Sequence, residues 1–330
     1  QLLEDVDLYC EDGFIRQIGP HLDVAADRTI DASHMLCYPG LVNTHHHLYQ
    51  VFSRNLPQVQ NMELFDWLKT LYEIWKNLDE DVIRLSSLTG MGELMKHGCT
   101  TCFDHHYVFP THAGDLIGAQ FAAADTLGIR MYASRGSMDL SVKDGGLPPD
   151  SVVQTVDEIM TDSARLIEKY HDTSYGAMHR IALAPCSPFS VSAELLRQSA
   201  VLARDLFEEE NKSCRIHVVD SASTSFAISM LAFHAAQMRQ NGLPATEIVA
   251  QLVEDTLHIG TYYLIDDISF LIKGGRISSI KGGLLTKMSI KPIVGARNGM
   301  AYHHSNALGF QKGLAKLVSL FRNNAFPGSD

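Results

Sequence analysis

The chain has 330 residues, of which 45% are hydrophobic and 20% are charged, as in globular proteins with one large or two medium domains. Its formal net charge of −11 disfavours nucleic acids and anionic membranes as partners, because both attract clustered Lys and Arg. No apolar stretch reaches the ~18 residues that a membrane span needs, and we expect no signal segment at the start.

The first 38 residues predict short strands and turns. Apolar residues alternate on both sides of Asp12-Gly13, which is the signature of a hairpin, and residues 28–31 predict one further strand. We therefore assign residues 1–38 to a β-sandwich fragment.

A regular alternation of strands and helices begins at residue 39. Apolar spacing predicts strands at 41–47, 100–105, 129–133 and 180–184. It predicts helices at 64–75, 82–95, 115–127, 151–170 and 193–208. Strands separated by helices of this length pair in parallel through right-handed crossovers. Residues 39–205 therefore predict an α/β fold that is the first half of a (β/α)8 barrel.

The pattern changes after a polar junction at residues 206–213. Beyond it we predict a strand at 215–220, helices at 227–240 and 246–256, and a strand at 261–265. We assign residues 214–330 to a separate α/β domain. A half barrel leaves edge strands unpaired, so strands of the second domain close the sheet, or a partner does, or the chain is marginally stable. One hypothesis is that strand 215–220 lies beside strand 180–184 and covers one edge.

His45 and His47 stand two residues apart at the end of the first barrel strand, so both imidazoles project from one face. The carboxyl ends of barrel strands carry the active sites of such enzymes, and imidazole is a common zinc ligand. Two solvent-facing histidines are the alternative interpretation. The surrounding run Pro-Gly-Leu-Val-Asn-Thr-His-His-His-Leu favours the metal.

Residues 1–205 resemble the amidohydrolase superfamily, in the branch that deaminates 8-oxoguanine, guanine and triazines. The motifs that carry the resemblance are PGLVNTHHH (39–47), LFDWL (64–68), GCTTCFDHH (98–106), RGSM (135–138), GGLPPD (145–150) and APCSPFS (184–190). The resemblance implies that His45 and His47 bind a divalent metal, with zinc favoured over iron. It also implies that Gln50 and Arg135 hydrogen-bond the ring of an aminopurine or triazine-like substrate.

Structural roles are the alternative for these polar residues. Arg135 would then form a salt bridge at the barrel rim, and Gln50 would cap the start of a helix. We expect His105 and His106 to support or pack against the site rather than bind metal, and His46 to face away from its neighbours.

Hydrolytic deamination by this family also needs ligands from the fifth, sixth and eighth strands. This sequence has no clear match to them, and the best substitute is His217 with Asp220, a weak candidate. Zinc takes about four ligands, so we expect an incomplete site and impaired turnover in this chain.

Residues 214–318 resemble the second domain of the DegV family of fatty-acid-binding proteins. The shared runs are VVDS (218–221), IDDISFL (265–271), KGGRIS (273–278) and LLTKMSIKPI (284–293). The resemblance implies a bound fatty acid, with Ser221 and Arg276 as ligand contacts; a turn at Ser221 and a helix cap at Arg276 are the alternatives. It also accounts for Asp220 without a metal.

Three functions stay open at this point: a deaminase-type hydrolase, a fatty-acid-binding module, and a composite chain with neither activity. The six scattered cysteines favour a reducing cytoplasm, and Cys99 and Cys102 are expected to be packed thiols rather than a redox pair. A homo-oligomer is compatible with each of the three.

Overall fold

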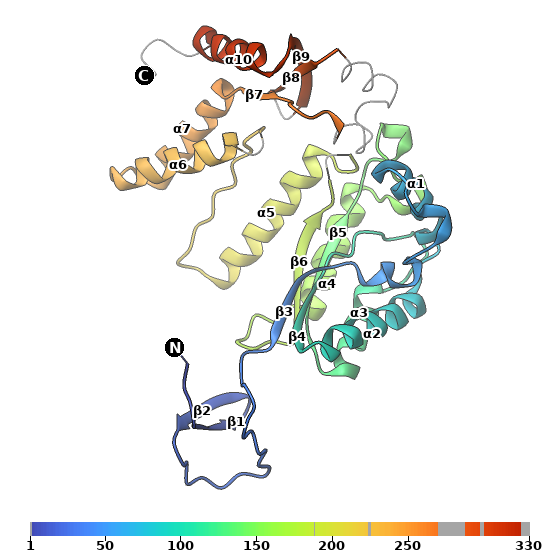
Figure 1. Cartoon of the computed structure of the whole chain (residues 1–330), viewed down its shortest axis with the longest axis vertical. Helices are drawn as coiled ribbons and strands as arrows, with labels where there is room; N and C mark the ends of the chain where they lie inside the picture. Colours follow the sequence, from blue (N-terminus) through green and yellow to red (C-terminus); the bar gives the residue numbers. More distant parts are fainter. Residues whose placement is uncertain (1, 188, 224–225, 270–287, 298–299, 325–330) are drawn as a thin grey trace. The chain divides into compact units, whose positions relative to one another are not determined.

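A computed structural model gives the fold and describes residues 2–187, 189–223, 226–269, 288–297 and 300–324 (Figure 1). The chain divides into two compact units, Gln1–Gly40 and Leu41–Asp330. None of the helices in the described ranges is both long and apolar enough to cross a membrane.

The first unit contains an antiparallel hairpin of β1 (Asp7–Glu11) and β2 (Phe14–Gly19), as the sequence predicts. Asp12 and Gly13 form its turn with φ of 53° and 78°, values that Asp tolerates and Gly adopts freely. The strand predicted at residues 28–31 is wrong. Asp31 accepts hydrogen bonds from the backbone N–H and hydroxyl of Ser33, and this local turn replaces strand pairing.

A parallel sheet dominates the second unit, in the order β3 (Leu41–His46), β4 (Cys99–Asp104), β5 (Arg130–Ser137) and β6 (His179–Pro185). This is the predicted half of a (β/α)8 barrel.

Five α-helices accompany the sheet, and α2 to α5 pack against β4, β5 and β6 (Figure 1). Their bounds are α1 (Leu64–Trp75), α2 (Glu80–Lys96), α3 (Leu116–Leu127), α4 (Val156–Tyr170) and α5 (Ala193–Glu210). Short 3-10 helices are η1 (Leu48–Ser53), η2 (Pro57–Val59), η3 (Val142–Asp144) and η4 (Asp150–Val152). Helix α4 begins later than predicted, because Thr155 and Glu158 form a capping box there.

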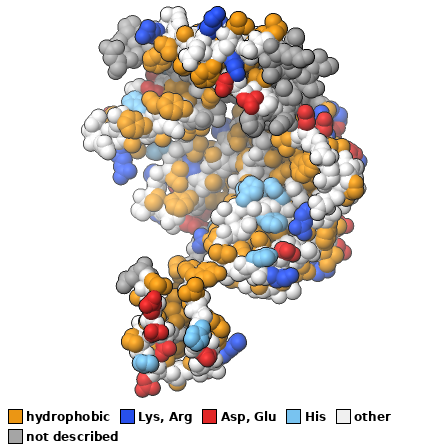
Figure 2. All heavy atoms as spheres, viewed as in Figure 1, with side chains coloured by type: hydrophobic (Ala, Val, Ile, Leu, Met, Phe, Trp, Pro, Cys, Tyr) orange, Lys and Arg blue, Asp and Glu red, His pale blue; other side chains and the backbone are white. Residues whose placement is uncertain are grey.

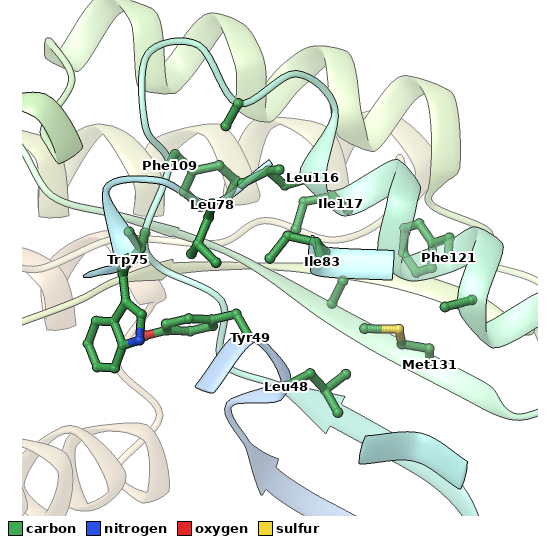
Figure 3. Packing of buried hydrophobic residues seen from close by; sticks show 14 of the residues in the cluster. Leu48, Tyr49, Trp75, Leu78, Ile83, Phe109, Leu116, Ile117, Phe121 and Met131 are labelled. Carbon is green, nitrogen blue, oxygen red and sulfur yellow. The ribbon is translucent and has the colours of Figure 1, made fainter. Parts of the chain in front are cut away.

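The apolar core lies between the sheet and helices α1 to α3 (Figure 3). Tyr49 packs edge-on against Trp75 with ring centroids 5.1 Å apart. Helix α2 comes so close to η1 that a Cβ at Gly90 would lie 2.6 Å from Leu48 Cδ2 and 3.2 Å from Val51 Cγ2. Glycine at position 90 therefore sets how closely α2 approaches the segment that follows β3.

The two faces of the sheet differ. Cys102, Met131 and Ile181 point toward the helices and are buried. Phe103, Tyr132 and Arg180 are aligned on the opposite face, where they stay half-buried. We call this second face the inner face, because it corresponds to the inside of a closed barrel.

Residues 214–220 form no strand, and the expected extension of the sheet beside β6 is wrong. The backbone N–H of Ile216 donates to Glu208 Oε1 at 2.6 Å, and that of Ala222 donates to Asp220 Oδ1 at 2.8 Å. Carboxylate side chains thus accept backbone N–H groups in this segment, which in a strand would bond to a neighbouring strand. Within the described residues, β3 and β6 remain the unpaired edges of their sheet.

The C-terminal part contains α6 (Phe226–Gln240), α7 (Ala245–His258) and an antiparallel sheet. That sheet has the order β7 (Thr261–Leu264), β8 (Ile290–Arg297) and β9 (Met300–Leu308), and α10 (Phe310–Asn324) packs on it. The KGGRIS run at 273–278, with Arg276, lies outside the described residues.

Candidate functional site

Three histidine rings meet at the carboxyl ends of β3 and β4. The rings of His45 and His47 are 5.1 Å apart, and His105 stacks on His45 at 4.4 Å. His46 turns away, toward Gly90 of α2. In the space-filling view, histidine side chains gather at the surface (Figure 2).

A hydrogen bond fixes the orientation of the His47 ring. Its Nδ1 lies 2.8 Å from the carbonyl oxygen of His105. Because a carbonyl only accepts, Nδ1 carries the proton and Nε2 keeps a free lone pair. Burial lowers the pKa of His47 and of His105, which keeps both imidazoles neutral, as metal ligands must be.

A pocket of about 390 Å³ opens beside His47. Polar groups in its wall come from His47, Gln50, Tyr107, Cys186, Ser187 and Ser190, and the rest of the lining is aromatic or aliphatic: Leu64, Phe65, Trp67, Leu68, Tyr72, Leu147 and Phe189. Burial raises the pKa of Tyr107 to about 12 and raises the pKa of the Cys186 thiol. Both groups are therefore neutral, and Cys186 lacks the thiolate character of a nucleophile.

Gln50 occupies the wall of this pocket, and its Nε2 donates to Tyr49 Oη at 3.1 Å. The carbonyl oxygen of the same amide has no such bond to Tyr49. Gln50 thus lies in the pocket wall, inside η1, and its contact with a substrate ring stays a prediction.

Arg135 is not in the pocket wall. Its side chain is fully buried, with Nε 2.8 Å from Asp162 Oδ2 and Nη2 2.7 Å from Gln154 Oε1, and its guanidinium lies 3.8 Å above the Phe109 ring. This is the salt bridge considered as the alternative role. A substrate contact by Arg135 stays a prediction, and in this structure the guanidinium is bonded to Asp162 and Gln154 instead.

Asp104 supports the site through its hydrogen bond to the backbone that follows His47. It was not among the site residues identified from the sequence. It is fully buried, and its two carboxylate oxygens accept from Leu48 N–H and from Gln120 Nε2, each at 2.6 Å. The first bond fixes the backbone directly after His47. An acidic residue at the end of a strand, in the run GCTTCFD, was the sequence feature that could have indicated it.

The weak metal candidates His217 and Asp220 are not brought together with His45 and His47. Both lie in the irregular segment after α5, and Asp220 Oδ1 accepts from the Ala222 backbone. In the described ranges no group of three or more His, Cys, Asp or Glu could hold a metal ion. The remaining residues of the sequence contain no His, Cys or Glu, and a single Asp, Asp330.

The donor set of one chain therefore does not fit a metal that takes four ligands, because it offers two imidazoles on one strand. For the lipid site, Ser221 Oγ donates to the Ser223 carbonyl at 3.3 Å, which is the turn role considered above. Arg276, its proposed companion, lies outside the described residues.

Comparisons with known proteins point to two families. A family model described as "Uncharacterised protein, DegV family" matches residues 154–328. The 8-oxoguanine deaminase of Pseudomonas aeruginosa is 49% identical over 173 residues, which are 52% of this chain and 38% of that protein. The hydroxydechloroatrazine ethylaminohydrolase of Pseudomonas sp. is 37% identical over 218 residues, which are 62% of this chain and 45% of that protein.

A solved structure agrees with these matches. The atrazine chlorohydrolase TrzN from Arthrobacter aurescens TC1, complexed with zinc, superposes with a TM-score of 0.59 at 35% identity, over 62% of this chain and 47% of that one. The chain spans less than half the length of each of these relatives. Zinc in that neighbour is consistent with a divalent metal, and nothing in the comparisons supports iron.

Proposed function

We propose that this chain, which belongs to the DegV family over residues 154–328, is a hydrolase that cleaves C–N bonds of a nitrogen heterocycle. Its β3–β6 sheet is that of an amidohydrolase. The substrate class is an aminopurine of the 8-oxoguanine type. The pocket beside His47 is the observation that carries this proposal, because it pairs a potential metal ligand with a ring-sized aromatic wall.

The pocket suits a planar heterocycle. Tyr107 meets the His47 ring edge-on at 5.6 Å, Phe65 meets Phe189 in the same way at 5.2 Å, and all four rings line the space. Aromatic faces contribute about 0.5–1.5 kcal/mol per ring contact beyond burial of area. Gln50 supplies an amide that matches the paired donors and acceptors on the edge of a purine.

Deamination replaces the exocyclic amino group of such a ring with oxygen from water and releases ammonia. The chain's own residues bind and orient the ring through Gln50 and Tyr107, while His47 lines the same pocket with Nδ1 held by the His105 carbonyl. The metal we propose is zinc, as in the related structure. Since one chain offers two imidazoles, we propose that turnover by an isolated chain is impaired.

Ring binding can be tested without turnover. The chain has two tryptophans, of which Trp67 lines the pocket and Trp75 is buried in the core. In a Trp75→Phe background we expect 8-oxoguanine to quench Trp67 fluorescence saturably. Gln50→Leu should weaken binding about tenfold, because a buried ring polar group loses its partner.

The matched control is Gln198→Leu, an amide change on α5 that should leave quenching unaltered. Absence of saturable quenching would contradict a heterocycle site. Ammonia release from 8-oxoguanine, guanine and a triazine then measures catalysis directly.

Fatty-acid binding is the second candidate function, supported by the DegV match over residues 154–328. Ser221 and Arg276 are the proposed contacts to the carboxylate. Native mass spectrometry of the purified chain should then show a co-purified acid, and Ser221→Ala should reduce its occupancy. A ligand-free spectrum after addition of palmitate would count against this function.

The six free thiols suit a reducing compartment such as the cytoplasm, and we place the protein there.

A further inference from the structure

Two tyrosines and an amide form a hydrogen-bonded group at one side of the pocket. Gln50 Nε2 donates to Tyr49 Oη at 3.1 Å, and the rings of Tyr49 and Tyr107 meet edge-on with centroids 5.7 Å apart. Tyr107 belongs to the pocket wall, whereas Tyr49 lies behind it and is 1% exposed. A hydroxyl buried to this degree takes its hydrogen-bond partners from neighbouring side chains.

The directions of these hydrogen bonds follow from the two phenols. Burial raises the pKa of both, and the bond between their hydroxyls raises the pKa of Tyr49 further while it lowers the pKa of Tyr107. Opposite effects of one bond mean that Tyr49 donates and that the Tyr107 oxygen accepts, because an accepted bond stabilises a phenolate. The Tyr49 hydroxyl is thereby fully engaged, since it accepts from Gln50 and gives its single proton to Tyr107.

The Tyr107 hydroxyl keeps its own proton for a ligand. Its oxygen accepts from Tyr49 and from the Gln50 amide, so the O–H is the group that remains. With a pKa of about 12, Tyr107 is protonated at neutral pH. Its ring stands edge-on to His47 in the pocket wall, with centroids 5.6 Å apart. The wall therefore offers a fixed O–H donor on an oxygen whose lone pairs are already engaged.

Such a donor distinguishes an oxo group from an amino group on a ring. A carbonyl oxygen accepts the O–H, whereas an exocyclic –NH2 at the same point sets one donor against another. A site built to pair with one polar group rejects analogues that lack it, because its own buried group then loses a partner.

We propose that Tyr107 is a specificity-determining residue of this pocket, which donates its hydroxyl proton to an oxo oxygen of the bound heterocycle. Tyr49 is the positioning residue, because its bond to the Tyr107 oxygen fixes that hydroxyl. This inference rests on the proposed function for the presence of a heterocycle in the pocket. It adds the chemistry of the ring, which must carry an oxo group that faces Tyr107.

A ligand series tests the oxo group directly. From 8-oxoguanine to guanine to 2-aminopurine, one oxo group is lost at each step. Equilibrium dialysis of the full chain against each ligand gives three dissociation constants. One of the two steps should weaken binding about tenfold, and that step identifies the oxygen that Tyr107 contacts.

Two variants then separate the roles of the tyrosines. Tyr107→Phe removes the donor and keeps the ring, so the tenfold step should shrink to less than about twofold. Tyr49→Phe leaves the Tyr107 hydroxyl free to rotate, so the same step should shrink in part. If Tyr49 had only a structural role, its variant would weaken all three ligands alike and leave the step unchanged, which would overturn its assignment as a positioning residue.

Tyr72→Phe is the matched control. Tyr72 is a buried tyrosine of the same pocket wall, and its hydroxyl donates to Met138 Sδ at 3.6 Å. Because its proton is already used, loss of this hydroxyl should leave the step between the ligands unchanged. Circular dichroism confirms that each variant is folded.

The outcomes separate this inference from the function on which it rests. Binding of all three ligands with equal affinity, or a tenfold step that survives Tyr107→Phe, would overturn the inference and leave a heterocycle site standing. Failure of all three ligands to bind would overturn the inference and the proposed function together. A step that Tyr107→Phe removes and Tyr72→Phe keeps supports both.

Discussion

Asp104 shows how a single residue holds the candidate site and sets its response to pH. Burial raises the pKa of this carboxyl to about 7, although bonds from Leu48 N–H and Gln120 Nε2 favour its ionised form. A folded-state pKa above the unfolded value means that the folded state takes up a proton between pH 4 and 7. Stability from this group is complete below pH 4 and is lost as pH rises to 7.

Asp104→Asn tests this assignment. Asparagine keeps an acceptor for Leu48, and the unpaired Gln120 Oε1 can turn to accept its amide, so the packing should survive. Each proton contributes about 1.4 kcal/mol per pH unit, so the unfolding free energy of the variant relative to the original chain should rise by about 3 kcal/mol between pH 5 and 8. Urea titrations of both proteins measure this difference. A pH-independent difference would contradict the assignment.

The residues of the site were predictable to different degrees. His45 and His47 follow from spacing, because two positions on a strand share a face. Arg135 could not be placed from sequence, since its partners Asp162 and Gln154 come from α4 and the loop before it. His105 was expected to play a supporting role, and it stacks on His45; its carbonyl bond to His47 depends on strand register, which spacing alone does not give.

At the scale of elements, Asp115 joins α3 to α4. It caps α3 by accepting from Gly118 N–H at 3.0 Å, and its other oxygen accepts from Arg165, Lys169 and Tyr170 at 2.8–3.3 Å. These bonds lower the pKa of Asp115 to about 2, against the opposing effect of burial. Its stabilising effect is therefore present above pH 4 and is lost as pH falls toward 2.

Asp115→Ala should lower the free energy of unfolding by about 2 kcal/mol at pH 7, since a helix cap and several charge-assisted bonds are lost together. Lys169→Met is the control, because it removes one donor and leaves the cap, and it should cost less than about 1 kcal/mol. Thermal or urea unfolding gives both values. Equal losses in the two variants would show that the cap contributes nothing.

Element prediction succeeded where apolar spacing and a terminator coincide. Gly128, with φ of 71°, ends α3 where the sequence predicted it, and β5 follows at once. Prediction failed at residues 215–220, which alternate like a strand but lie where Glu208 and Asp220 accept backbone N–H groups. Alternation indicates a capacity to pair and cannot show that a partner strand is available.

At the scale of the whole molecule, the irregular segment at residues 211–223 separates the β3–β6 sheet and its helices from α6 and the later elements of the chain. Its lysine and arginine, Lys212 and Arg215, are exposed, whereas Arg165 and Lys169 lie inside α4. Exposed irregular backbone is cleaved first by proteases, because a protease needs an extended substrate.

Limited trypsin digestion should therefore cut first at Lys212 or Arg215 and give two lasting fragments that meet there. Mass spectrometry of the early products identifies the site. The variant Lys212→Gln with Arg215→Gln should delay this cleavage while leaving the unfolding midpoint unchanged. First cuts inside α2 or α4 would show instead that the helices around the parallel sheet open more readily than this segment.

Architecture as a whole was largely predictable, because strand–helix alternation and the two sets of motifs named both parent folds correctly. What pairs with the edge strands β3 and β6 was not predictable, since edge pairing depends on partners that a single strand does not specify.

The close approach at Gly90 also constrains how this protein could be re-engineered. Side chains that line the pocket, such as Leu64 and Phe189, can be exchanged to admit larger or smaller rings. A methyl group at position 90 would instead push against Leu48 and Val51 and shift the η1 segment as a body. For the heterocycle site that we propose, directed evolution toward other rings should therefore accept many replacements along the wall and almost none at this one point of helix α2.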